Sequence, residues 1–174
     1  DMSSLFANFH NFNGNISNWD TSNVTNMSYM FFDCYNFNQP LEWDTSNVTN
    51  MSSMFRGATT FDQPLEWDTS NVTNMSEMFE EAENFNYPLN WNTSNVTDMR
   101  GMFDGALIFN QHLRWDTSNV TNMSMMFANT EYFNRPLNWN TKNVTNMQDM
   151  FEGAIGFNQP LNFTHPSLQY MYVP

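Results

Sequence analysis

The chain has 174 residues, of which 17% are aromatic and only 13% are charged, and its formal net charge is −13. Nucleic-acid binding requires clustered Lys and Arg side chains, so the five basic residues exclude nucleic acid as a partner and disfavour an anionic membrane surface. The single cysteine excludes an intrachain disulfide, and no apolar run approaches the ~18 residues of a membrane span.

An internal repeat of 24 residues is the dominant feature of the sequence, and Trp marks it at every interval. The Trp residues are Trp19, Trp43, Trp67, Trp91, Trp115 and Trp139. A period of roughly 20 to 50 residues indicates a solenoid, propeller or array, and a four-stranded propeller blade needs about 40 residues. We therefore expect one repeat solenoid domain over residues 1–174, with about seven coils of 24–25 residues.

Both ends of the chain depart from the regular repeat. Residues 1–11 match part of a coil, and the regular coils span 12–162, with one extra position between Ile16 and Trp19. Beyond them, residues 163–174 leave the pattern, because Phe163 takes the Trp place and residues 165–170 do not match the repeat. Such irregular ends are typical of terminal coils, so we expect a C-terminal cap or docking segment there.

Within a coil, three segments are predicted in chain order. Residues 40–43 alternate between apolar and polar side chains, which favours a short parallel strand with Pro40 at its first position. Residues 44–47 are rich in Asp and Asn, which is typical of a turn. Residues 51–58 place apolar side chains at i, i+3, i+4 and i+7, which predicts a short helical turn.

The frame FNQPLEWDTSNVTNMSSMF at residues 37–55 resembles the BspA-like leucine-rich-repeat surface proteins, and in particular their mycoplasma-lipoprotein-type subgroup. The match covers nearly the whole chain, and the motif is long. The resemblance implies a leucine-rich-repeat-like solenoid, an extracellular or cell-surface location, and a role in adhesion or protein contact. It supplies no catalytic residues.

An acidic ladder follows the Trp row, and its candidate metal ligands are Asp20, Asp44, Asp68 and Asp116. Stacked coils would place these carboxylates ~4.8 Å apart, where they would repel or share a cation such as Ca²⁺. Asn occupies the equivalent positions 92 and 140. Because Asn removes charge that a metal site would use, we expect a row of Asx turns, and no metal or other cofactor.

A second ladder consists of the Asn residues that open each Asn-Val-Thr sequon. They are Asn23, Asn47, Asn71, Asn95, Asn119 and Asn143. Glycans on every coil would crowd one another, so we expect inward side chains that hydrogen-bond to the backbone of adjacent coils. Glycosylation is the alternative. The strict periodicity of the Trp and Met rows likewise predicts core residues and no aromatic ligand site.

The candidate binding residues are those that vary between coils on the predicted strand face. They are Gln39, Glu42, Gln63, Glu66, Tyr87, Asn90, Gln111, Arg114, Arg135 and Asn138. Tyr and Arg are favoured as interface anchors, although simple drift on a solvated surface explains the variation equally well. A second varied strip could support lateral contacts, and it contains Phe32, Tyr35, Leu107, Ile108, Tyr132 and Ile155.

Two functions are compatible with these features. The first is a cell-surface adhesion or protein-interaction module that binds a protein or glycan through the strand face. The second is a structural subunit whose copies associate end to end or laterally into an extracellular fibre. Catalysis requires a few unlike groups that converge once, and no such constellation is present, so an enzyme is not expected.

Overall fold

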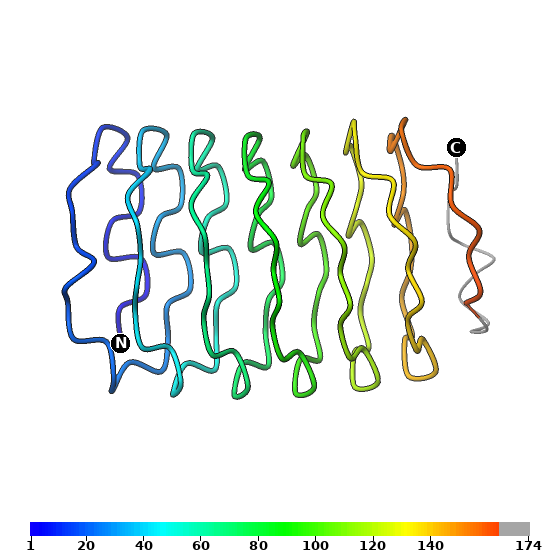
Figure 1. The fold of residues 1–174 in the computed structure, drawn as a ribbon, viewed down its shortest axis with the longest axis horizontal. Helices are drawn as coiled ribbons and strands as arrows, with labels where there is room; N and C mark the ends of the chain where they lie inside the picture. Colours follow the sequence, from blue (N-terminus) through cyan, green and yellow to red (C-terminus); the bar gives the residue numbers. More distant parts are fainter. Residues whose placement is uncertain (164–174) are drawn as a thin grey trace.

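The computed structural model describes residues 1–163, which form an elongated stack of coils that lie side by side in chain order (Figure 1). The predicted period is confirmed, because side chains 24 residues apart stack on one another from coil to coil. Residues 164–174, most of the predicted C-terminal cap, lie outside the described part of the chain. The regular coils are numbered 1 to 6, and their bounds are 12–36, 37–60, 61–84, 85–108, 109–132 and 133–156.

The core consists of apolar rows that run the length of the stack. Phe37 stacks on Phe61 at 5.9 Å, and Trp43 stacks on Trp67 at 6.4 Å between ring centroids. The Trp row continues at 6.2–6.4 Å through coil 6. Rings inside the row are therefore covered by their equivalents on both sides, and the Trp side chains from Trp43 to Trp139 are only 5–7% exposed. A single coil would leave these surfaces in water, so coil stacking stabilises the fold.

The predicted strand at 40–43 is not formed, and no residue of 1–163 belongs to an extended strand. Among the described residues, no backbone N–H of 40–43 or of the equivalent segments bonds a neighbouring coil. Side chains join the coils here instead. The Trp67 indole N–H donates to the Leu41 carbonyl at 2.9 Å, and the Thr45 hydroxyl donates to the Asp68 carbonyl at 2.9 Å.

Parallel pairing does occur, but only as single bridges at another position of the coil. The bridges join Asn26, Asn50, Asn74, Asp98, Asn122 and Asn146 in succession. The backbone comes close enough for pairing at this corner, where the Thr49 N–H donates to the Thr25 carbonyl at 2.8 Å. The predicted parallel alignment is therefore confirmed at one residue per coil, outside the segment where it was expected.

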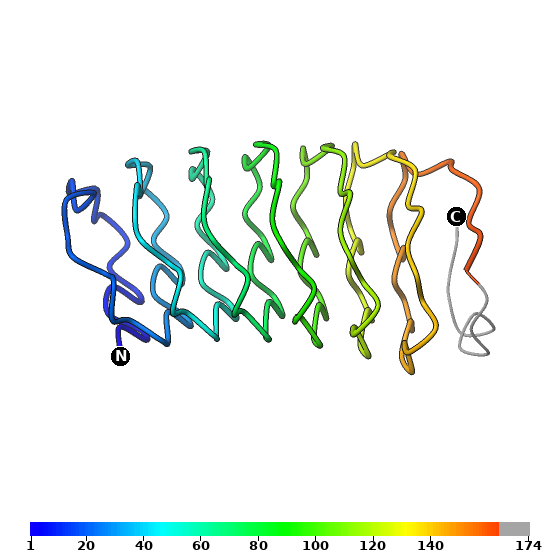
Figure 2. The same ribbon diagram turned by 60° about the horizontal axis from the view of Figure 1, so that its bottom comes forward.

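The predicted helical turn at 51–58 is wrong, since no helix occurs within residues 1–163 (Figure 2). The segment is a series of tight turns, in which Ser53 and Gly57 have φ angles of 53° and 72°. Alternate N–H groups bond within the coil, as from Ala58 to Phe55 at 3.0 Å, or to the next coil, as from Phe55 to Met78 at 2.9 Å. This alternation ties each coil to its neighbour, which a helix would not do.

The first coil shows the effect of its extra residue. The Trp43 indole donates to the carbonyl of Ile16, 27 positions earlier, whereas later Trp residues bond a Leu 26 positions earlier. Trp19 lies against Phe6 with ring centroids 5.7 Å apart, much as Trp43 lies against Phe31 at 6.1 Å, but Trp19 is 41% exposed. No helix that could span a membrane is found among the described residues.

Candidate functional site

The segments around the Trp row form one side of the stack, which we call the groove face. It comprises 39–43, 63–67, 87–91, 111–115 and 135–139. Shallow grooves lie between neighbouring coils, with volumes of about 530, 560 and 450 Å³. The first is lined by Pro40, Trp43, Pro64 and Trp67, among others. Leu and Trp form an apolar floor, while Pro forms the ribs between grooves.

One row of the predicted binding residues points out of the groove face. Glu42, Glu66, Asn90, Arg114 and Asn138 are all exposed, and each lines a groove. The alternation expected from the sequence is therefore confirmed here, although the backbone is not a strand. The row differs from coil to coil on an otherwise constant frame.

The other predicted row is largely occupied by contacts within the stack. The Gln63 amide donates to the Asn38 carbonyl at 3.2 Å, and the Gln111 amide donates to the Asn86 carbonyl at 2.9 Å. Tyr87 is half-buried against the core. These side chains connect adjacent coils, so their first role is structural. Gln39 opens this row and is half-buried.

Arg135 belongs to the same row and lies beside His112, which lines the groove between coils 5 and 6. Its Nε donates to the Asn110 carbonyl at 3.0 Å, and its Nη1 lies 3.2 Å from His112 Nε2. His112 and Arg114 both line that groove. The groove between coils 2 and 3 is instead lined by Glu42 and Glu66. The two grooves therefore carry opposite charge.

The Asp ladder forms exposed Asx turns. In coil 2, the backbone N–H and the hydroxyl of Ser46 donate to Asp44 Oδ1 at 3.0 and 2.6 Å. The Ser46 hydroxyl and then its N–H lower the pKa of Asp44, because both hydrogen bonds favour the charged carboxylate. Asp20, Asp68 and Asp116 have equivalent partners. Across residues 1–163, no group of three or more His, Cys, Asp or Glu side chains is placed to hold a metal ion.

The Asn ladder makes the predicted hydrogen bonds to the backbone of the adjacent coil, but its side chains lie at the surface. The Asn47 amide donates to the Ser22 carbonyl of the preceding coil at 2.6 Å, and Asn71 bonds Ser46 in the same way at 2.7 Å. The side chains are exposed, so the predicted inward orientation is wrong. The corner where they lie is at the surface, and the amide reaches the neighbouring coil along that surface.

The second varied strip is split between the two ends of the stack. Ile108, Tyr132 and Ile155 are exposed apolar side chains of coils 4 to 6, and Ile155 is 74% exposed. Tyr35 lies at the other end, where its ring stacks on His10 at 4.5 Å. The strip predicted from sequence is therefore not continuous.

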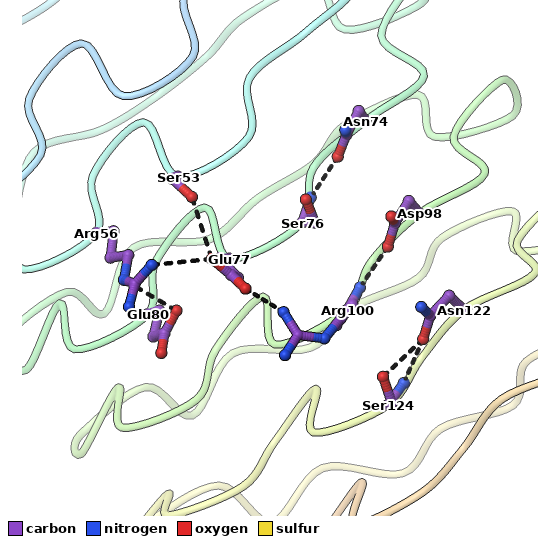
Figure 3. A network of polar contacts seen from close by, with 10 residues as sticks. All are labelled: Ser53, Arg56, Asn74, Ser76, Glu77, Glu80, Asp98, Arg100, Asn122 and Ser124. Carbon is purple, nitrogen blue, oxygen red and sulfur yellow. Dashed lines mark hydrogen bonds and ion pairs between the residues drawn. The ribbon is translucent and has the colours of Figure 1, made fainter. Parts of the chain in front are cut away.

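A charged network on the turn side was not anticipated (Figure 3). Arg56 Nη1 lies 3.1 Å from Glu77 Oε2, Arg56 Nε lies 3.2 Å from Glu80 Oε2, and Arg100 pairs with the other Glu77 oxygen. The Arg56 Nε–Glu80 Oε2 contact is not aligned as a hydrogen bond. Glu80 Oε2 is therefore buried with an ion-pair partner but without a hydrogen-bond donor. Burial raises the pKa of Glu80 to about 7 despite the nearby Arg56. The paired residues come from different coils, so no local motif announces them.

Comparison with known proteins gives one positive finding. A family model described as "Mycoplasma protein of unknown function, DUF285" matches residues 1–90 and again residues 89–171. No curated protein and no solved structure matches the chain.

Proposed function

This chain belongs to the DUF285 family of mycoplasma proteins of unknown function, and we propose that it is an extracellular or cell-surface module that binds a protein or glycan through its groove face. The observation that supports this most is the outward row that includes Glu66, Asn90 and Arg114. Its members change from coil to coil, while the buried side chains beneath them repeat. Selection for folding alone does not require different charges along this row.

The shape of the groove face also supports recognition. Ligand sites are typically concave and mostly apolar, with a few polar groups that fix orientation. Each groove combines a Leu and Trp floor with charged or amide side chains at its rim. A repeated set of shallow grooves suits an extended partner, such as a peptide segment or a polysaccharide, better than a small molecule. We assign no catalytic role, because the rims hold no convergent set of unlike reactive groups.

The resemblance to BspA-like leucine-rich-repeat proteins supports the proposed location and the adhesive role. Within that proposal, the coil is a variant of the leucine-rich-repeat coil, in which wide Trp stacking replaces the parallel sheet. Neither nucleic acid nor a membrane surface is proposed as a partner, since the chain carries only five basic residues.

The test is attachment to a printed array of glycans and extracellular-matrix proteins. We expect Arg114→Glu to weaken attachment to any bound probe by about 5–10-fold, as truncation of an interface anchor does. The double change with Arg135→Glu should weaken it further, although Arg135 also holds Asn110. Lys142→Glu is the matched control, because it reverses the same charge at an exposed position outside the grooves. Equal attachment of all variants would remove the groove face as the binding site.

A structural role in a fibre is the second candidate, and the exposed apolar side chains of coils 4 to 6 favour it. Ile108, Tyr132 and Ile155 are 36%, 57% and 74% exposed. Buried against the side of another stack, they would promote lateral association. Light scattering decides this point, since a species of 20.5 kDa at all concentrations would exclude the fibre.

A further inference from the structure

The groove face has opposite charge at its two ends. Glu42 and Glu66 are exposed in coils 2 and 3, and Arg114 is exposed in coil 5. Asn90 lies between them in coil 4, one coil from Glu66 and one coil from Arg114. About coil 4, Glu66 and Arg114 therefore carry opposite charge at equal separation, whereas Glu42 in coil 2 corresponds to the neutral Asn138 in coil 6.

We propose that the groove face pairs with the groove face of a second copy of the chain, with the two stacks antiparallel. The two-fold axis lies in the plane of contact and crosses coil 4 at Asn90. This inference deepens the proposed function, because it rests on the groove face as a recognition surface and names its partner. Glu66 then faces Arg114 of the second copy, and Arg114 faces Glu66 of the second copy.

The repeat gives the two copies the same spacing, and the Glu66–Arg114 charges select the register. A partner for the row must carry charges two coils apart, and the Trp rings that mark each coil are spaced at 6.2–6.4 Å. A second copy has the same spacing because it has the same coils. The same rotation places the acidic groove between coils 2 and 3 opposite the basic groove between coils 5 and 6. An isologous contact of this kind closes after two copies.

The remaining charge limits the strength of the dimer. Each copy has a formal net charge of −13, so two copies repel each other at long range. At an ionic strength of about 0.15 M, charges more than about 8 Å apart are largely screened, whereas pairs in contact are screened less. Exposed ion pairs contribute little individually. We therefore expect a weak dimer that is populated at high protein concentration and moderate salt.

The experiment is sedimentation equilibrium of the whole chain at concentrations up to about 1 mM, where weak association is still measurable. We expect the wild type to dimerise, and Glu66→Arg and Arg114→Glu each to weaken the dimer at least about 10-fold, since each creates two like-charge pairs. An equimolar mixture of the two variants restores both ion pairs, so it should form a heterodimer. Lys142→Glu should dimerise like the wild type.

A wild type that remains monomeric, or variants whose mixture does not associate, would overturn the inference. Failure of folding is distinguished by circular dichroism of each variant before the mixture is made. Failure of the proposed function is distinguished from failure of the dimer by the attachment assay. Arg114-dependent attachment to an array probe by a strictly monomeric protein would keep that function and remove the dimer. Heterodimer formation without any bound probe would keep the groove face as a recognition surface and leave the second copy as its partner.

Discussion

Replacement of Trp91 by Phe tests whether the indole row holds the coils together on the groove side. The Trp91 side chain is 5% exposed, and its indole N–H donates to the Leu65 carbonyl at 2.8 Å. Its ring lies between Trp67 and Trp115, at centroid distances of 6.4 and 6.3 Å. Phe keeps an aromatic ring in the row but removes the donor and part of the buried ring area.

Two losses add to the expected cost. A buried carbonyl that loses its donor costs about 1–3 kcal/mol. Removal of part of a buried aromatic side chain costs about 1–2 kcal/mol more, less than the full truncation of Trp to Ala. We therefore expect Trp91→Phe to lower the free energy of unfolding by about 2–5 kcal/mol.

The assay is urea unfolding followed by circular dichroism, with Asn90→Ala as the control. Asn90 is exposed on the same coil, so its replacement should change stability by no more than about 0.5 kcal/mol. A loss below about 1 kcal/mol for Trp91→Phe would show that the indole bonds between coils are dispensable. It would also refute the explanation for the absence of a strand at 40–43.

Two further changes test the turn side of the coils. Burial raises the pKa of Glu80 to about 7 from an ordinary value of 4.5, so the folded chain retains a proton that the unfolded chain loses between these values. The melting temperature of the wild type should therefore fall as pH rises through this window, and Glu80→Gln should remove that fall. An equal dependence of the melting temperature on pH in both proteins would contradict this explanation. Gly57→Ala places a methyl group at φ 72°, beside the Asp33 side chain, and should cost about 1–2 kcal/mol in urea unfolding. Ser52→Ala is its control, and equal stability of the two variants would contradict the left-handed turn.

The stacking of coils could be predicted from sequence because one apolar pattern recurs without interruption from Trp19 to Trp139. The backbone of each coil could not. A spacing of i, i+3, i+4 and i+7 fits a helical turn, but the turns at 51–58 satisfy it as well. The sequence did contain one signal for these tight turns, which is a glycine at the same position of three coils. Gly57, Gly105 and Gly153 all have positive φ, which glycine adopts readily.

The candidate site was predictable to the extent that side chains alternate along the chain. This alternation correctly placed Glu66, Asn90 and Arg114 at the surface. The inward role of Gln63 depends on its distance to Asn38 in the preceding coil, which a single coil does not reveal. The Arg56–Glu77 pair has the same origin, because its residues are 21 positions apart and meet only after stacking.

Amide hydrogen exchange with and without a bound array probe tests the recognition role of the groove face most directly. On the turn side, backbone N–H groups already bond the next coil, as from Phe55 to Met78 at 2.9 Å. Among the described residues, no comparable backbone ladder crosses the groove side. We therefore predict that the probe slows exchange in 63–67, 87–91 and 111–115 and leaves 51–58 and its equivalents unchanged. Slowed exchange on the turn side alone, with the groove segments unaffected, would contradict the proposed function.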